Sequence, residues 1–188
     1  MMERPEYITL NVFSVNIHLV KEIILKVPKG VKIILGGKSV KYFIEELFSL
    51  NVENELIVTI GEGEYIIPAI VNGNISEEEN RALEFGYSNC GKIYVVDKKS
   101  KYYPEDLSKV ELDRTLLGKR TIYNHYGMLE EAIITSRECM YDCAFCGGAR
   151  SLNRDVTIRE KDEESIIAEI NQIVELNKKV ESIRILDD

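Results

Sequence analysis

The sequence predicts an α/β protein in which short buried strands alternate with helices. Two nearly continuous apolar runs, 31–35 and 56–60, are typical of strands that are buried on both faces of a sheet. Other segments carry apolar residues at helical spacing, and glycine-rich turns close the strands. Strands that alternate with helices in this way favour a parallel sheet, because each parallel connection needs a crossover.

The first half of the chain holds most of this alternation. Residues 7–14 are rich in β-formers, and residues 16–27 have helical spacing that ends at a Pro-Lys-Gly turn. Gly36-Gly37 and a Gly-Glu-Gly-Glu run at 61–64 each follow a strand, and glycine permits a tight turn or the close approach of a ligand. The expected elements are strands over 7–14, 31–35, 56–60 and 92–96 and helices over 16–27, 40–50 and 65–71.

The second half carries one more strand–helix–strand unit. A strand is expected over 131–136, an amphipathic helix over 160–176 and a strand over 182–186. The stretch before them holds many charges with little sustained periodicity, which is typical of a linker. The expected parts are a Rossmann-like domain over 1–97, a linker over 98–128 and a second domain over 129–188.

Composition and charge exclude several classes of protein. The 188 residues have a formal net charge of −8, which argues against general nucleic-acid binding. No apolar run is long enough to span a bilayer, and the N-terminal residues lack the pattern of a signal peptide. Three of the four cysteines are clustered, which favours metal ligation in a reducing compartment over a disulfide framework. We therefore expect a cytoplasmic protein that binds neither membranes nor nucleic acid.

The clustered cysteines are Cys139, Cys143 and Cys146, and their spacing is C-x3-C-x2-C. Thiolates are the usual ligands of iron–sulfur clusters. A structural zinc ion takes four protein ligands, whereas three cysteines leave one coordination position open for chemistry. The spacing therefore indicates a metal centre. A zinc site completed by Cys90 or His125 is the alternative.

This loop resembles the cluster loop of radical S-adenosylmethionine (SAM) enzymes, which have the same spacing and an aromatic residue, here Phe145, before the last cysteine. The resemblance implies that Cys139, Cys143 and Cys146 hold three irons of a [4Fe-4S] cluster and that SAM binds the fourth. It places Phe145 near the adenine ring and Gly147-Gly148 at a turn beneath the cluster. An electron donor such as ferredoxin or flavodoxin would then drive cleavage of SAM to a 5′-deoxyadenosyl radical.

The order of the two halves resembles the cobalamin-binding type of radical SAM protein, in which a Rossmann-like domain precedes a partial (βα)6 barrel. The resemblance covers residues 7–71 and 129–188. It implies cobalamin as a further cofactor, bound near Gly36 and Gly37 at the carboxyl ends of the strands, and methyl transfer as the reaction. The family's cobalamin motif, Asp-x-His-x-x-Gly, is absent from the chain.

Only one helix and one strand are expected after Cys146, so most strands of the barrel are missing. We therefore expect a truncated radical SAM protein, or a chain whose open sheet edges are covered by a second copy in a homo-oligomer. The substrate is unknown, because its pocket would lie on the missing strands. Two other functions stay open: a non-catalytic remnant that acts as an interaction domain, and a small zinc- or iron–sulfur-binding protein.

Overall fold

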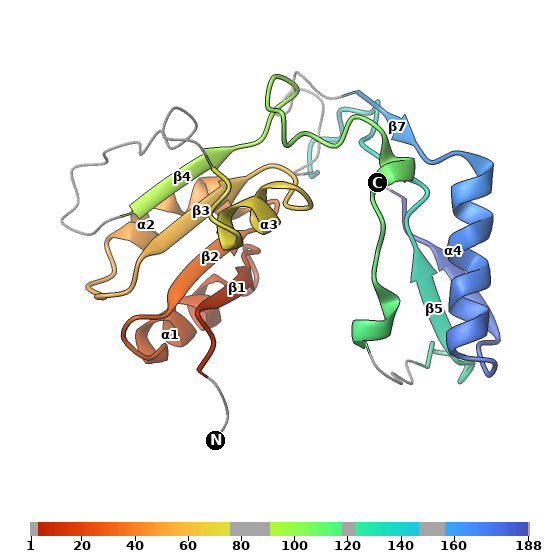
Figure 1. The fold of residues 1–188 in the computed structure, drawn as a ribbon, viewed down its shortest axis with the longest axis horizontal. Coiled ribbons are helices and arrows are strands. Elements are labelled where there is room, and N and C mark those ends of the chain that lie inside the picture. The colour runs from red at the N-terminus through yellow and green to blue at the C-terminus, as the bar shows by residue number, and fades with distance from the viewer. Residues whose placement is uncertain (1–3, 76–90, 118–122, 147–156, 188) are drawn as a thin grey trace. The chain divides into compact units, whose positions relative to one another are not determined.

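The computed structural model describes residues 4–75, 91–117, 123–146 and 157–187 (Figure 1). The chain divides into two compact units, Met1–Tyr103 and Pro104–Asp188. Each unit combines parallel strands with helices, which confirms the predicted α/β class.

The first unit is built on a four-stranded parallel sheet whose strands lie side by side in chain order. The strands are β1 (Tyr7–Asn11), β2 (Lys32–Gly36), β3 (Leu56–Ile60) and β4 (Gly91–Val95). Leu35 pairs with Leu10 on one side and with Val58 on the other, so the carboxyl ends of the strands share one edge. This sheet with its helices is consistent with the Rossmann-like fold that the sequence predicts.

Helices bury both faces of this sheet. On one face lie α1 (Ile17–Lys26) and α2 (Ile44–Phe48), where Ile24 and Leu47 are completely buried. On the other lies α3 (Ile66–Val71), whose buried isoleucines pack against a second set of strand residues. Successive strand residues are therefore buried on opposite faces, which explains why the strands are apolar throughout.

Two predicted elements of the first unit are shorter than expected. The strand predicted over 7–14 ends at Asn11, because the side chain of Asn16 closes a turn there. Its Nδ2 donates to the Asn11 carbonyl at 2.9 Å, and its Oδ1 accepts from the N–H of Phe13 at 2.7 Å. The helix predicted over 40–50 is divided into a 3-10 turn at Val40–Tyr42 and α2, since the backbone between them leaves helical geometry.

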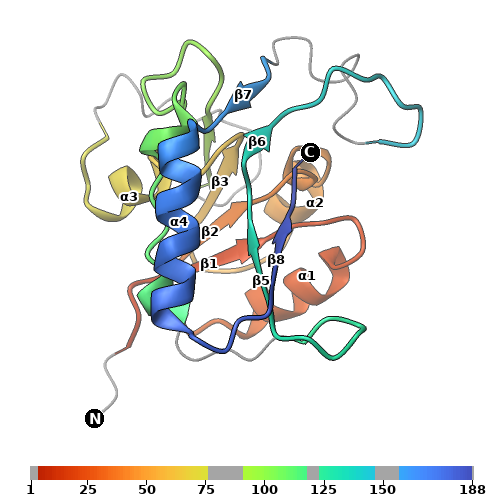
Figure 2. The ribbon, with the colours of Figure 1, turned by 90° about the vertical axis from the view of Figure 1, so that its right-hand side faces the viewer.

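The second unit contains the predicted strand–helix–strand order, with two parallel strands joined through a helix (Figure 2). The elements are β5 (Glu130–Ile133), β6 (Ser136–Arg137), β7 (Arg159–Glu160), α4 (Glu163–Leu176) and β8 (Ser182–Ile185). β5 pairs with β8, and β6 pairs antiparallel with β7. Asp162 is the N-cap residue of α4, and its carboxylate accepts a hydrogen bond from the N–H of Ser165 at 2.7 Å.

Residues 104–117, which the sequence analysis assigned to the linker, belong to this second unit. They form two 3-10 turns, Leu107–Lys109 and Arg114–Leu117. The Arg114 side chain is buried and donates to the carbonyl of Ala132 on β5 at 2.8 Å. This segment is attached to the unit by separate buried residues and not by one face of a helix. Its sequence therefore shows no regular apolar period.

Candidate functional site

The cysteine loop belongs to the second unit and connects β6 to β7. These strands close its base, because Ser136 lies opposite Glu160 and Arg137 lies opposite Arg159. The loop therefore starts just beyond the carboxyl end of β5. Open parallel sheets bind their ligands at this end of the strands.

All three predicted metal ligands are free thiols. Cys139 is partly buried, whereas Cys143 and Cys146 are exposed. The N–H of Cys146 donates to the Cys143 carbonyl at 3.0 Å, which closes a β-turn with these two cysteines at its ends. Phe145 lies within the turn and is 93% exposed, so its ring is open to a ligand.

In the structure the three cysteine side chains do not lie close enough together to share a metal ion. Within the described part of the chain, no group of three or more His, Cys, Asp or Glu side chains lies close enough together to hold a metal ion. The donor chemistry nevertheless fits an iron–sulfur cluster, because three free thiols on one loop supply its usual ligands. Gly147 and Gly148, the predicted turn beneath the cluster, lie outside the described residues.

The base of the loop has an uncommon backbone conformation. Glu138, directly before Cys139, has a φ of 77°, which residues other than glycine seldom adopt. Its carboxylate lies 3.6 Å from the guanidinium of Arg159. Arg159 is itself buried and donates to the Pro104 carbonyl at 2.6 Å. Such conformations persist only where their surroundings enforce them, and they concentrate at functional sites.

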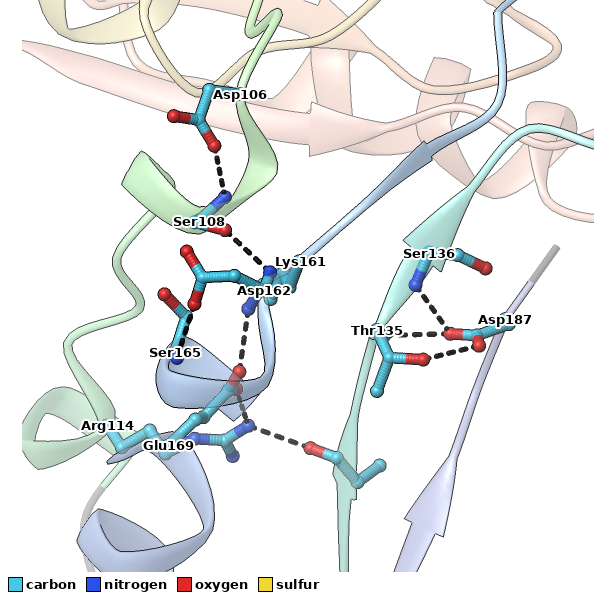
Figure 3. Close-up of polar contacts among 11 residues, drawn as sticks. Asp106, Ser108, Arg114, Thr135, Ser136, Lys161, Asp162, Ser165, Glu169 and Asp187 are labelled. Atoms are coloured by element: carbon cyan, nitrogen blue, oxygen red, sulfur yellow. Dashed lines mark hydrogen bonds and ion pairs between the residues drawn. The ribbon is translucent and has the colours of Figure 1, made fainter. Parts of the chain in front are cut away.

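A second contact at the base joins the ends of β5 and β8 (Figure 3). The carboxylate of Asp187 accepts hydrogen bonds from the N–H groups of Thr135 and Ser136 at 2.7 and 2.9 Å. It also accepts from the Thr135 hydroxyl at 2.5 Å. Burial opposes ionisation of Asp187, but these hydrogen bonds outweigh it and hold the pKa of the carboxyl below its ordinary value.

An ion-pair network of the buried Arg114 with the partly buried Glu169 and Lys161 lies along the other side of β5 (Figure 3). Glu169 of α4 accepts a hydrogen bond from Arg114 and another from the Lys161 ammonium at 2.6 Å. Burial opposes the charge on Glu169, but its bonds to Lys161 and Arg114 lower the pKa of this carboxyl. Arg114 also holds the Ala132 carbonyl, so the network attaches α4 and the Arg114 turn to β5.

Gly36 and Gly37, the predicted cofactor-binding glycines, lie where β2 ends in the first unit. A Cβ on Gly37 would stand 2.0 Å from Oδ1 of Asn11, and one on Gly36 would stand 3.0 Å from Oγ1 of Thr59. Gly37 also has a φ of 107°. The close packing of the chain against itself therefore explains both glycines without a ligand.

Sequence reasoning did not find a cavity of about 230 Å³ at the amino ends of the same strands. Its polar lining consists of Tyr7, Lys32, Glu55, Lys92 and Tyr94. Lys32 donates to the Tyr7 hydroxyl at 3.2 Å, and this bond raises the pKa of the lysine. Lys92 pairs with Glu55 at 2.7 Å, with the same effect on its pKa. Both ammonium groups are thus already engaged by neighbouring strands.

The sequence did not predict the contacts that hold the loop base, although one signal pointed to the pair formed by Thr135 and Asp187. Thr135 lies near the end of the strand expected over 131–136, and Asp187 follows the strand expected over 182–186. Carboxyl ends of adjacent parallel strands share an edge, so the two residues could be expected to lie close together. For Glu138 and Arg159 the sequence carries no comparable signal. Of the alternative zinc ligands, His125 lies against the ring of Tyr126 with centroids 3.8 Å apart, and Cys90 lies outside the described residues.

Comparison with known proteins finds no matching family model, curated protein or solved structure. Within the described residues, no helix has both the length and the apolar character needed to cross a membrane. Function is therefore inferred from the chemistry and the placement of the cysteine loop.

Proposed function

We propose that this chain binds a [4Fe-4S] cluster through Cys139, Cys143 and Cys146, and that SAM on the open iron makes this cluster a radical-generating centre. One observation carries the proposal: the C-x3-C-x2-C spacing stands on a loop that follows the carboxyl end of a parallel strand. Three cysteines are one ligand fewer than a four-iron cluster needs, so one iron is left for a substrate-like ligand.

Two features of the loop support this proposal. The β-turn from Cys143 to Cys146 presents two thiols from neighbouring points of the chain, and both are exposed. The paired strands β6 and β7 hold the base of the loop, while the cysteines lie beyond it. A fixed base with exposed ligands lets the loop close around a metal centre without a change in the sheet.

A reduced cluster held by Cys139, Cys143 and Cys146 would supply the one electron needed to break a sulfur–carbon bond of SAM, with methionine and a 5′-deoxyadenosyl radical as the products. The chain's own contribution is to bind and to orient. The three cysteines hold the irons, and the exposed ring of Phe145 offers an apolar face against which adenine can pack. The electron comes from an external donor of the ferredoxin or flavodoxin type.

The proposal does not extend to cobalamin. A cofactor that approached the backbone at Gly36 and Gly37 would need the space above these glycines. Asn11 and Thr59 already occupy the positions that a Cβ would meet there. The glycines thus have a structural role that accounts for them.

Anaerobic reconstitution with ferrous iron and sulfide tests the proposal. We expect about four irons and four sulfides per chain, and an EPR spectrum of the reduced protein that changes when SAM is added. Cys143→Ala removes one of three ligands and should abolish cluster loading. Cys90→Ala is the matched control, because Cys90 lies outside the motif, and it should load like the unmodified chain.

Two results would contradict this function, and they differ in what they favour. Stoichiometric zinc with no uptake of iron would favour a structural zinc site. If the chain loads an iron–sulfur cluster but its EPR spectrum does not change with SAM and no 5′-deoxyadenosine forms, the result would favour an electron-transfer protein or a non-catalytic remnant.

A further inference from the structure

We propose that Asp187 is a positioning residue for the cysteine loop, because its carboxylate clamps together the ends of β5 and β8 directly before the loop begins. This inference rests on the proposed function, since the clamp matters for a cluster only if the loop binds one. Asp187 itself does not touch the cysteines. It acts through Thr135 and Ser136, which lead into the loop.

The clamp extends the pairing of two strands past their last ladder residues. The β5–β8 ladder ends where Ile133 pairs with Ile185, and the N–H of Leu186 still donates to the Ile133 carbonyl at 2.8 Å. Beyond that point the Asp187 carboxylate accepts hydrogen bonds from Thr135 and Ser136, which connect the two strands (Figure 3). The chain that enters the loop is therefore held at a place where strand pairing has already stopped.

Three donors converge on this one carboxylate. The Thr135 and Ser136 N–H groups both point to Oδ1, and the Thr135 hydroxyl points to Oδ2. An ionised carboxylate has only acceptors, so it satisfies all three donors at once. Bonds from a charged acceptor are also stronger than bonds between neutral groups. The arrangement defines both the position and the direction of the Thr135–Ser136 peptide.

The same short segment is held from its other side as well. The Thr135 carbonyl accepts from the N–H of Lys161 at 2.8 Å, and β6 pairs with β7 one residue later. Together these contacts fix the chain up to Glu138, whose unusual φ then sets the direction of Cys139. Removal of the Asp187 contact would free one side of this support. Cys139 would then be less well positioned to join the other two cysteines around a cluster.

The test compares cluster release from four variants of the full chain after reconstitution. Asp187→Ala removes all three hydrogen bonds and should speed the extraction of iron by a chelator about tenfold. This is the lower end of the effects seen when residues that orient metal ligands are lost. Thr135→Val removes only the hydroxyl bond and should speed it about threefold. Asp187→Asn keeps an oxygen for the two N–H groups and an amide for the hydroxyl, so it should stay within about twofold of the unmodified chain. Glu175→Ala, at an exposed position of α4, controls for loss of a negative charge.

The EPR spectrum separates positioning from simple structural support. A support role would reduce the amount of cluster in proportion to the loss of folded protein seen by circular dichroism. A positioning role would change the g-values of the cluster that remains in Asp187→Ala, with recovery in Asp187→Asn. If Asp187→Ala does not fold, the extraction rate of Thr135→Val decides the question.

The outcomes distinguish this inference from the function beneath it. If the unmodified chain takes up no iron, the proposed function fails and this inference fails with it. If it loads a cluster and Asp187→Ala or, where that variant is unfolded, Thr135→Val releases iron at the unmodified rate, only the positioning role is wrong. An equal increase in the rate of iron extraction in Asp187→Ala and Asp187→Asn would also overturn the positioning role, because the hydrogen bonds that Asn keeps would then not matter for cluster retention.

Discussion

The two parallel sheets of this protein are stabilised in different ways. In the first unit, Ile33, Leu35 and Leu56 of β2 and β3 are at most 1% exposed. In the second unit, most residues of β5 and β8 are only partly buried, and Ile185 at the end of β8 is 60% exposed. The first sheet is therefore held by apolar burial on both faces, whereas the second has little completely buried surface to contribute.

The second unit relies on polar contacts in its place. Glu169 joins Arg114 and Lys161 in a buried network, and Asp187 joins the ends of the two strands. Such contacts depend on ionisation, whereas apolar burial does not. The unit that carries the candidate cluster loop should therefore respond to pH and to single charge changes that leave the other unit intact.

The largest effect is expected from a cavity in the first sheet. Leu35→Ala removes a completely buried side chain and should lower the free energy of unfolding by about 2–5 kcal/mol. Urea titration followed by hydrogen exchange of β2 and β3 measures it. Leu19→Ala, at a position of α1 that is 51% exposed, is the control and should change little. Similar losses from both variants would mean that burial does not distinguish this unit.

A smaller loss is expected when the ion-pair network of the second unit is broken. Glu169→Ala leaves Arg114 and Lys161 without their shared carboxylate and should destabilise the unit by about 3 kcal/mol. Glu169→Gln keeps one acceptor and should cost less. Hydrogen exchange of α4 and β5 reports the change, with β2 and β3 as the internal reference. Equal protection of α4 in both variants and the unmodified chain would contradict this account.

The smallest effects come from pH, and they should have opposite signs in the two units. The pKa values of Glu169 and Asp187 are lowered in the folded chain, from ordinary values of 4.5 and 3.8. Their contribution is complete above these values and is lost as the pH falls through the lower folded values. Acid below about pH 4 should therefore increase exchange in the second unit first.

In the first unit the titrating contacts are those of Lys32 and Lys92, whose pKa values are raised from 10.5 by bonds to Tyr7 and Glu55. Their contribution is present below that value and is lost as the pH rises through the higher folded values. Alkali above about pH 10.5 should thus weaken this sheet at its amino ends. Loss of hydrogen-exchange protection in both units at the same acidic pH would contradict the proposed difference in how the two units are stabilised.

Much of the fold could be predicted because it is encoded by local patterns. The predicted strand over 56–60 has the observed bounds of β3, and the amphipathic helix over 160–176 contains α4. The predictions were wrong where a single side chain interrupts a pattern. Asn16 ends β1 early, although most residues of the stretch 7–14 favour a strand.

The candidate site divides in the same way. The cysteines were found because their spacing is itself the signal, within eight residues of chain. For Arg114 and Glu169 the sequence carries no signal, since no sequence pattern reveals that they are partners in the fold. The stretch around Arg114 was assigned to a linker for the same reason.

The order of residues alone determined the α/β class, the positions of most elements and the thiol chemistry of the loop, because periodicity and spacing are local properties. Tertiary structure decided which distant groups meet: Asp187 with Thr135, Arg114 with Glu169, and Arg159 with Glu138. These contacts require the pairing of β5 with β8 and of β6 with β7, and the packing of α4 beside them. The reason is physical, since a side chain far along the chain becomes a neighbour only when burial of the intervening elements brings it there.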